Sequence, residues 1–306
     1  MTAITPEVLR TLHQLVVRRP FRRSRVDDET SQDIRNKLQR VTEEQGPISF
    51  SVPFGGYKAP QLLHSPHLNW AEVFWLDYLR SYAQPLADLY AGGVVFSFSY
   101  MSGVLAVINQ IPETQQRCYI NELQQLMSSA SCNKIRFELV DLAEAFGGSA
   151  NALQAVQQRY SEFLHYWPVS IEAEQQKLAS AKRNLPVELQ HNSEEVRKSA
   201  MLCDAMESLE LRRQFNKFSH RIQLTHVRGG SLSVHMGSCR GSVMQPWVGY
   251  GIVDKGVHRI VSDIALPDLA VVETDHLAKI DTKLQKMITG HPSPALTTLY
   301  LIQDAV

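Results

Sequence analysis

Segments of strand type alternate with long segments of helix type through the first half of the chain. Residues 48–52 alternate apolar and polar side chains, and residues 94–98 are apolar apart from one serine, as in a buried strand. Between them, residues 69–90 have the length and apolar content of a buried helix, and a helix at 112–128 and a strand at 135–140 continue the series. Strands that alternate with helices of this length favour parallel pairing, so the sequence predicts an α/β fold with a mostly parallel sheet covered on both faces.

The rest of the chain extends this plan. The further predicted elements are helices at 5–18, 28–45 and 274–289, strands at 232–235, 250–253, 259–261 and 297–302, and a hairpin turn at 254–256. Residues 150–222 are charged and helical, with few turn signals. Because sheet segments flank this helical middle, we predict one α/β domain over residues 1–306, with 150–222 as a helical insertion or subdomain.

Composition narrows the class of protein. The 306 residues are 44% hydrophobic and carry 31 basic and 31 acidic side chains. Proteins that bind duplex nucleic acid usually have a basic excess, which this chain lacks. No apolar run reaches the roughly 18 residues of a membrane span. The N-terminus does not resemble a signal peptide. The four cysteines include no C-x-x-C pair. We therefore expect a cytoplasmic protein that acts on a small polar molecule, without nucleic acid or membrane.

Candidate site residues follow the first two strands. In an open parallel sheet, ligands bind beyond the carboxyl ends of the strands. Lys58 follows the first strand on a loop with two glycines, where it would hold an anion or act as a base, or be a surface lysine on a tight turn. Ser99 and Tyr100 follow the second strand, where their hydroxyls suit either a polar ligand or a turn.

A second group of candidates lies near a later strand and near the N-terminus. His235 ends an apolar strand and is a candidate acid or base, although a strand-end histidine is also common as a structural residue. Arginines are candidate anion ligands, and Trp247 lies on the loop that follows. The arginines concerned are Arg228 and Arg240 beside His235, together with Arg18 and Arg19, which alternatively belong to a solvated loop. His64 and His67 are close in sequence but have no third ligand at matching spacing, so we expect no metal.

The order of several short motifs resembles the pyoverdine/dityrosine biosynthesis family, whose bacterial members include isocyanide (isonitrile) synthases. The similar segments, in chain order, are Arg18-Arg19, Pro53-Phe54-Gly55-Gly56-Tyr57-Lys58-Ala59-Pro60, Asn69-Trp70-Ala71-Glu72, Tyr90-Ala91-Gly92-Gly93, Leu232-Ser233-Val234-His235 and Pro246-Trp247. The resemblance implies a Rossmann-like enzyme without a metal or redox cofactor. It further implies conversion of an amino acid's α-amine to an isonitrile, with ribulose 5-phosphate as the carbon donor.

The candidate residues divide into two groups by expected role, and the resemblance suggests the roles of Lys58, His235, Arg18, Arg19 and Arg240. Lys58, His235 and Tyr100 are the expected catalytic residues. The expected substrate-binding residues are Arg18, Arg19, Ser99, Arg228, Arg240 and Trp247.

The chain departs from the family at three points. A Gly-Gly-Tyr step precedes Lys58, Tyr100 stands where the family has an acid, and Val248 replaces a histidine. These departures leave open a divergent enzyme with other C–N or C–C chemistry on an amino-acid-derived metabolite. A third hypothesis is a non-catalytic partner protein that uses the charged helical middle. A homodimer is compatible with each hypothesis.

Overall fold

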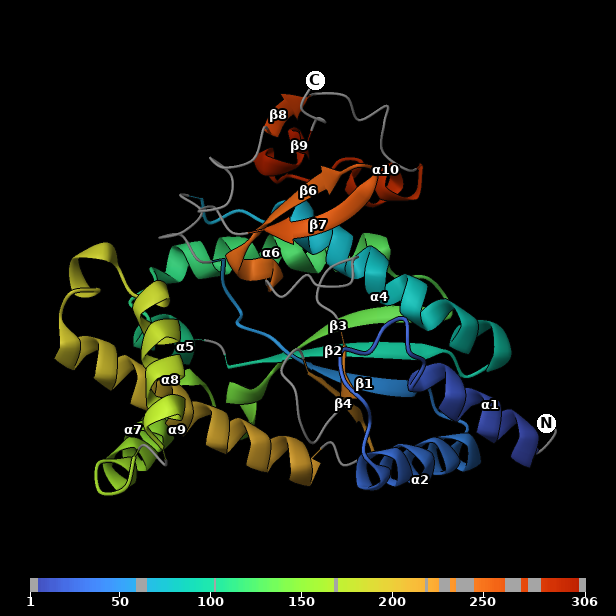
Figure 1. Cartoon of the computed structure of the whole chain (residues 1–306), viewed down its shortest axis with the longest axis horizontal. Helices are drawn as coiled ribbons and strands as arrows, with labels where there is room; N and C mark the ends of the chain where they lie inside the picture. Colours follow the sequence, from blue (N-terminus) through green and yellow to red (C-terminus); the bar gives the residue numbers. More distant parts are fainter. Residues whose placement is uncertain are drawn as a thin grey trace.

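The computed structural model of the chain contains two β-sheets, one parallel and one mixed (Figure 1). It describes residues 5–58, 65–101, 103–167, 170–217, 220–225, 232–234, 245–261, 271–274 and 282–302. The larger sheet has five strands in the order β3-β2-β1-β4-β5, and its neighbouring strands all pair in parallel. The parallel α/β fold expected from the alternation of segments is therefore confirmed.

The elements of the parallel sheet include the predicted series, together with a strand at 222–225 and a short helix at 104–108 that were not predicted. Its strands are β1 (Ile48–Pro53), β2 (Val94–Tyr100), β3 (Ile135–Asp141), β4 (Ile222–Thr225) and β5 (Leu232–Ser233). Its helices are α1 (Pro6–Val16), α2 (Asp28–Glu44), α4 (Trp70–Leu89), α5 (Val104–Ile108) and α6 (Glu113–Ala130). In the view of Figure 1, α4 and α6 lie above the strands and α2 lies below them.

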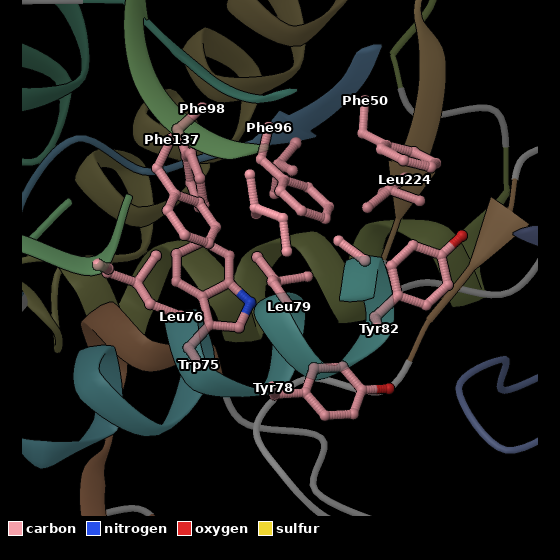
Figure 2. Close-up of a cluster of buried hydrophobic side chains, with 14 of the residues drawn as sticks. Phe50, Trp75, Leu76, Tyr78, Leu79, Tyr82, Phe96, Phe98, Phe137 and Leu224 are labelled. Atoms are coloured by element: carbon pink, nitrogen blue, oxygen red, sulfur yellow. The ribbon is translucent and has the colours of Figure 1, made fainter. Parts of the chain in front are cut away.

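Helix α4 packs its aromatic and leucine side chains against one face of the sheet. Figure 2 shows Trp75, Leu79 and Tyr82 of this helix facing Phe50 and Phe96 of β1 and β2. The rings of Phe50 and Phe96 stack with centroids 5.2 Å apart, and both side chains are fully buried. Large rings that interlock in this way contribute both buried area and ring–ring contact energy, so this layer is the main core.

Arg18 compensates for a proline inside α4. Pro85 has no N–H, so it cannot donate to the carbonyl of Ser81 one turn earlier. Arg18 Nη2 donates to the Ser81 carbonyl at 3.2 Å and also to the carbonyl of Tyr82. Its guanidinium lies over the rings of Phe21 and Tyr82, at 4.4 and 5.2 Å from their centroids. This arginine therefore stabilises the helix at the point where its hydrogen-bond ladder is interrupted.

The helical middle has a hydrophobic core of its own. It consists of α7 (Ser149–Phe163), α8 (Ile171–Asn184) and α9 (Ser193–Lys217), which follow a short 3₁₀ helix at Leu142–Phe146. Its buried cluster also includes Val104 and Ile108 of α5, so α5 connects this core to the end of β2. Within it, Asp204 accepts hydrogen bonds from both Trp167 and Lys177.

The C-terminal strands form a second, mixed sheet. Its strands are β6 (Tyr250–Asp254), β7 (Val257–Val261), β8 (Val271–Thr274) and β9 (Leu299–Ile302), in the order β7-β6-β9-β8. The predicted hairpin joins β6 to β7, and Lys255 and Gly256 take the positive φ values of 50° and 77° that such a turn requires. The sheet packs on α4, because the backbone of Gly251 lies against Trp70 and Ala71, where a β-carbon would be 2.3 Å from Trp70.

One sequence prediction needs correction in this region. Of the helix expected at 274–289, the described part is α10 (Thr282–Ile288), and Thr274 belongs to strand β8 instead. Its β-branched neighbours favour a strand, which pairs antiparallel with β9. Among the described strands that follow the helical middle, β4 and β5 join the parallel sheet and β6 to β9 form the mixed sheet.

None of the helices in the described part of the chain combines the length and the apolar character needed to cross a bilayer.

We predict that Arg18→Ala lowers the free energy of unfolding by about 1.5–3 kcal/mol, the range for a hydrogen bond to a charged group. In a Pro85→Ala background the same change costs less, because the substituted alanine supplies an N–H to the Ser81 carbonyl. Urea unfolding of the four proteins of this double-mutant cycle measures the difference. Equal costs in both backgrounds would show that Arg18 does not compensate for the proline.

Candidate functional site

The loop that follows β1 is fixed by a buried ion pair. Lys58 Nζ lies 2.6 Å from Glu72 Oε1, and neither side chain is exposed to solvent. Nζ also donates to the carbonyl oxygens of Pro246 at 2.7 Å and Gly249 at 3.2 Å. An ammonium group has three N–H donors, so all three are used by acceptors within the protein. The Lys58 loop and the Pro246-Trp247 loop, which are far apart in sequence, therefore meet.

Glu72 is held in place by the start of α4. Asn69 is the N-cap of this helix, and its backbone N–H donates to Glu72 Oε2 at 2.9 Å, which completes a capping box. Tyr119 of α6 donates its hydroxyl to Glu72 Oε1 at 3.0 Å. The carboxylate is thus fixed by a helix cap, a phenol and an ammonium at once.

Burial has the largest effect on the protonation of this pair. It lowers the pKa of the Lys58 ammonium and raises the pKa of the Glu72 carboxyl, because desolvation penalises the charged form of each group. The opposite charge of the partner acts against both shifts. With every N–H used, these contacts favour a structural role for Lys58, and its catalytic role stays a prediction.

Trp247 lies in the core. Its side chain is buried and packs edge to face on Phe54 and Trp75, with centroid distances of 5.3 and 5.8 Å. Gly55 makes room for the indole, since a β-carbon there would lie 2.8 Å from Trp247 Nε1. The substrate-binding role expected for this residue stays a prediction, and its position favours a packing role.

The arginine-containing segment after α1 lies beside strand β5, which precedes His235 in the chain. Arg22 forms an antiparallel bridge with Val234, and the Arg23 amide donates to the Ser233 carbonyl at 2.8 Å. Arg18 Nη2 donates to carbonyls of α4, and its Nη1 is buried without a hydrogen-bond partner among the described residues. Arg19 is exposed. Three further predicted site residues lie outside the described residues, namely Arg228, His235 and Arg240.

Ser99 and Tyr100 end β2. Ser99 is buried, its hydroxyl lies 3.4 Å from that of Ser51, and its carbonyl accepts the Phe54 amide. Burial, and then the charges of Asp141 and Glu144, raise the pKa of Tyr100 to about 12. The Tyr100 phenol is therefore neutral near pH 7 and acts as a hydrogen-bond donor rather than as a base.

A pocket of about 570 Å³ opens beside Tyr100, at the carboxyl end of β2. It is lined by residues of α5, α6 and α7 and of the loop before α5. The lining residues that bear polar groups or helix-start amides are Tyr100, Gly103, Glu113, Gln116, Arg117, Ser149 and Ala150. Its volume suits a small metabolite, and its place is the one expected for a ligand of a parallel sheet.

The pocket presents hydrogen-bond donors. Helix α7 begins at Ser149 and α6 at Glu113, and neither N-terminus is capped by a side chain. Helix starts without a side-chain cap, together with the helix dipole, favour an anion. Gln116 Oε1 accepts the Gly103 amide at 3.3 Å, and its Nε2 is buried without a partner in the described part of the chain. At the rim, Arg117 pairs with Glu113 at 2.5 Å, both well exposed.

Sequence reasoning missed this pocket. Gln116, Arg117 and Ser149 belong to no motif, and the fold brings them together at the pocket from the separate helices α6 and α7. The available signals were the two uncapped helix starts, Pro112-Glu113 and Gly147-Gly148-Ser149. The positive φ of 111° at Gly148 shows why a glycine stands before α7.

Together, the fold and the pocket define a Rossmann-like α/β protein with a candidate small-molecule site at the carboxyl edge of its parallel sheet. Among solved structures, the chain has the fold of the PvcA protein from Pseudomonas aeruginosa, with a TM-score of 0.69 and 15% sequence identity. The match covers 87% of this chain and 96% of PvcA. It confirms the fold that the family resemblance implied.

A tyrosyl-tRNA synthetase from Aeropyrum pernix matches over 71% of this chain and 52% of the synthetase, with 13% identity. Its TM-score of 0.34 does not establish a shared fold. No family model matches the chain, and no curated protein matches it significantly.

We predict that Lys58→Met lowers the free energy of unfolding by about 3–5 kcal/mol, because it leaves the Glu72 charge buried and unpaired. Glu72→Gln is also destabilising, and the double variant loses less than the sum of the two single changes by about 0.5–3 kcal/mol. Urea unfolding measures all three. A stable Lys58→Met protein that has lost only activity would instead support the catalytic role.

We predict that stability falls as pH rises above about 10, the ordinary pKa of tyrosine. Between that value and the Tyr100 pKa of about 12, the unfolded chain has lost a proton that the folded protein keeps, so folding is disfavoured. Urea unfolding across this range should show a shallower fall for Tyr100→Phe. The fall should remain in part, because burial also raises the pKa values of Tyr57, Tyr82 and Tyr119. Identical pH dependence in both proteins would contradict the shift.

Proposed function

We propose that the protein is a biosynthetic enzyme that acts on a small anionic metabolite bound in the pocket between α5, α6 and α7. The observation that carries the proposal is the buried Gln116 Nε2, which has no partner among the described residues of a pocket that also holds two uncapped helix starts. A buried amide donor without an acceptor is costly, so a ligand oxygen at this position would stabilise it. The fold shared with PvcA and the family resemblance both support a biosynthetic role.

The pocket residues suit distinct parts of such a ligand. A carboxylate or phosphate would accept from the first-turn amides of α7 and from Gln116 Nε2. Arg117, at the rim, would add a positive charge when it exchanges Glu113 for the ligand. The neutral Tyr100 hydroxyl would donate a hydrogen bond, or a proton, to a group deeper in the pocket.

The finer proposal follows from the resemblance. The substrate would be an amino acid whose α-amine is converted to an isonitrile, with the carbon taken from ribulose 5-phosphate. Both molecules carry an anionic group, a carboxylate and a phosphate respectively, which suits a pocket of donors. In this reading Tyr100 stands where the family has an acid, so a phenol would take over a polar contact to the substrate.

A second candidate is an enzyme of the same fold with other C–N or C–C chemistry. It is favoured by Tyr100, whose neutral phenol cannot replace a carboxylate as a base. It is also favoured by Val248, which packs against the hydrophobic core where the family has a histidine. Different protonation chemistry at two positions is a physical reason for a different reaction on a shared scaffold.

Incubation of the protein with each amino acid and ribulose 5-phosphate, followed by mass spectrometry, tests the reaction. We expect Gln116→Leu to raise KM about tenfold or more, as loss of a hydrogen bond to a charged group predicts. Tyr100→Phe should lower kcat more than it raises KM. Gln125→Leu, on an exposed position of the same helix, is the matched control and should behave as wild type.

A binding measurement separates the site from the reaction. Thermal shift with inorganic phosphate, sugar phosphates and amino acids should show stabilisation that Gln116→Leu weakens and Gln125→Leu does not. Binding without consumption of any amino acid would reject isocyanide chemistry and support the second candidate. If no anion stabilises the wild type, or if Gln116→Leu binds equally well, the pocket is not the substrate site.

A further inference from the structure

Three metal-ligand donors of different chemistry converge on one point at the middle of α6. His67 Nδ1 lies 2.5 Å from Glu122 Oε1, and Cys118 Sγ lies 3.6 Å from each of these two atoms. Cys118 and Glu122 are one helical turn apart on α6, and His67 comes from the segment just before α4. We propose that these three residues form a zinc site, which does not depend on the proposed function.

The spacing of the donors agrees with tetrahedral zinc. With zinc bonds of about 2.3 Å to sulfur and about 2.05 Å to nitrogen or oxygen, the sulfur–nitrogen and sulfur–oxygen edges of a tetrahedron are about 3.6 Å. Both edges to Cys118 Sγ have this length. The nitrogen–oxygen edge should be about 3.3 Å. The contact of 2.5 Å between His67 and Glu122 is that of a hydrogen bond, so it would open by about 0.8 Å around the ion.

The arrangement does not suit a nucleophilic triad. In such a triad the imidazole receives the nucleophile's proton on one ring nitrogen and is oriented by a carboxylate on the other. Here the thiol and the carboxylate both approach the same nitrogen, Nδ1 of His67. A metal ion requires donor atoms gathered around a single point, whereas a triad requires partners at both nitrogens of the imidazole ring.

Neighbouring groups hold the Glu122 carboxylate in position. Its Oε2 accepts the Leu68 amide at 3.0 Å, which leaves Oε1 for the ion. The backbone carbonyl of Glu122 lies 2.8 Å from the ring Nε2 of His291. Hydrogen bonds of this kind around the ligands fix their orientation before the metal binds. The Glu122 side chain is only 7% exposed, whereas His67 is 32% exposed, so an ion has a route to the site.

The proposed site is separate from the pocket. Glu113, Gln116, Arg117 and Ile120 line the pocket at helical spacing, so they share one face of α6. Positions 118 and 122 fall on the opposite face of the same helix. Three protein donors leave one tetrahedral position for water or another ligand. The metal would join the start of α4 to the middle of α6, in addition to the Lys58–Glu72 pair.

Zinc is the ion that the donor set favours. A thiolate with an imidazole and a carboxylate is a mixed set typical of zinc, whereas calcium and magnesium prefer oxygen ligands alone. Cobalt(II) occupies such sites with the same geometry and reports sulfur ligation as a near-ultraviolet charge-transfer band. Cobalt therefore serves as the spectroscopic probe.

The test uses the full chain after dialysis against a chelator. We expect one equivalent of cobalt(II) to give tetrahedral visible bands and the thiolate charge-transfer band, and zinc to displace it. Cys118→Ser should abolish the charge-transfer band and weaken zinc binding, measured by competition with a chromogenic chelator, at least tenfold. Glu122→Gln and His67→Gln should weaken it similarly. Zinc should also raise the Tm of the wild type but not of Cys118→Ser.

Cys132→Ser is the matched control, because this thiol is exposed just beyond the end of α6 and should leave both signals unchanged. Circular dichroism of each variant shows that the fold is intact, and Cys118→Ala provides a second variant if serine disturbs it. A wild type that binds neither ion overturns the proposal. So does a charge-transfer band that persists without the Cys118 thiol. Neither result depends on the enzyme's substrate.

Discussion

The buried contact between Lys58 and Glu72 is the constraint on which much of the structure depends. A charged pair without solvent must have every donor and acceptor satisfied, because each unpaired group would cost several kcal/mol, on the order of the desolvation of an ion. Here the requirement is met only when three regions come together: the loop after β1, the N-terminus of α4, and the backbone at Pro246 and Gly249 that leads into β6. The pair thereby fixes the second sheet relative to the first.

The same requirement, that buried donors and acceptors be paired, explains two other features. Arg18 supplies the donor that Pro85 removes from α4, so a residue whose sequence context suggests an anion ligand is used inside the fold. At the pocket, in contrast, hydrogen-bond donors are left without acceptors in the described part of the chain. Gln116 Nε2 lacks a partner among the described residues, and the starts of α6 and α7 have no side-chain cap. Arg18 thus stabilises the scaffold, whereas the Gln116 amide donor marks a place in the pocket where a ligand oxygen would be stabilised.

The parts of the fold that local chemistry controls were predictable. The strands at 48–52, 94–98 and 135–140 were found from apolar and β-branched runs, and each pairs in parallel as expected. Strand β8 was missed because Val271-Val272-Glu273-Thr274 is short and gains its identity only by pairing with β9. The division of the strands into two sheets could not be predicted, since a strand's pattern gives its faces but not its partners.

The candidate sites show the same limit. The loops carrying Lys58 and Trp247 were found from their composition, and the structure brings them together, but both side chains lie in the interior. The sequence analysis found no third metal ligand to accompany His67. Cys118 and Glu122 lie about one helix turn apart on α6, roughly fifty residues further along the chain, so spacing in the sequence cannot reveal them. Gln116 gave no signal, since a glutamine becomes informative only when its environment is known.

The sequence by itself determined the class of the fold, because contacts between near neighbours set the alternation of segments. The same local contacts set the turn at Lys255-Gly256 and the helix starts at Thr5, Asp27 and Asn69. Only the tertiary structure decided which polar groups serve the scaffold and which are available to a ligand. The physical reason is burial: the cost of an unpaired donor or charge depends on what surrounds it, and those surroundings are assembled from residues distant in the chain.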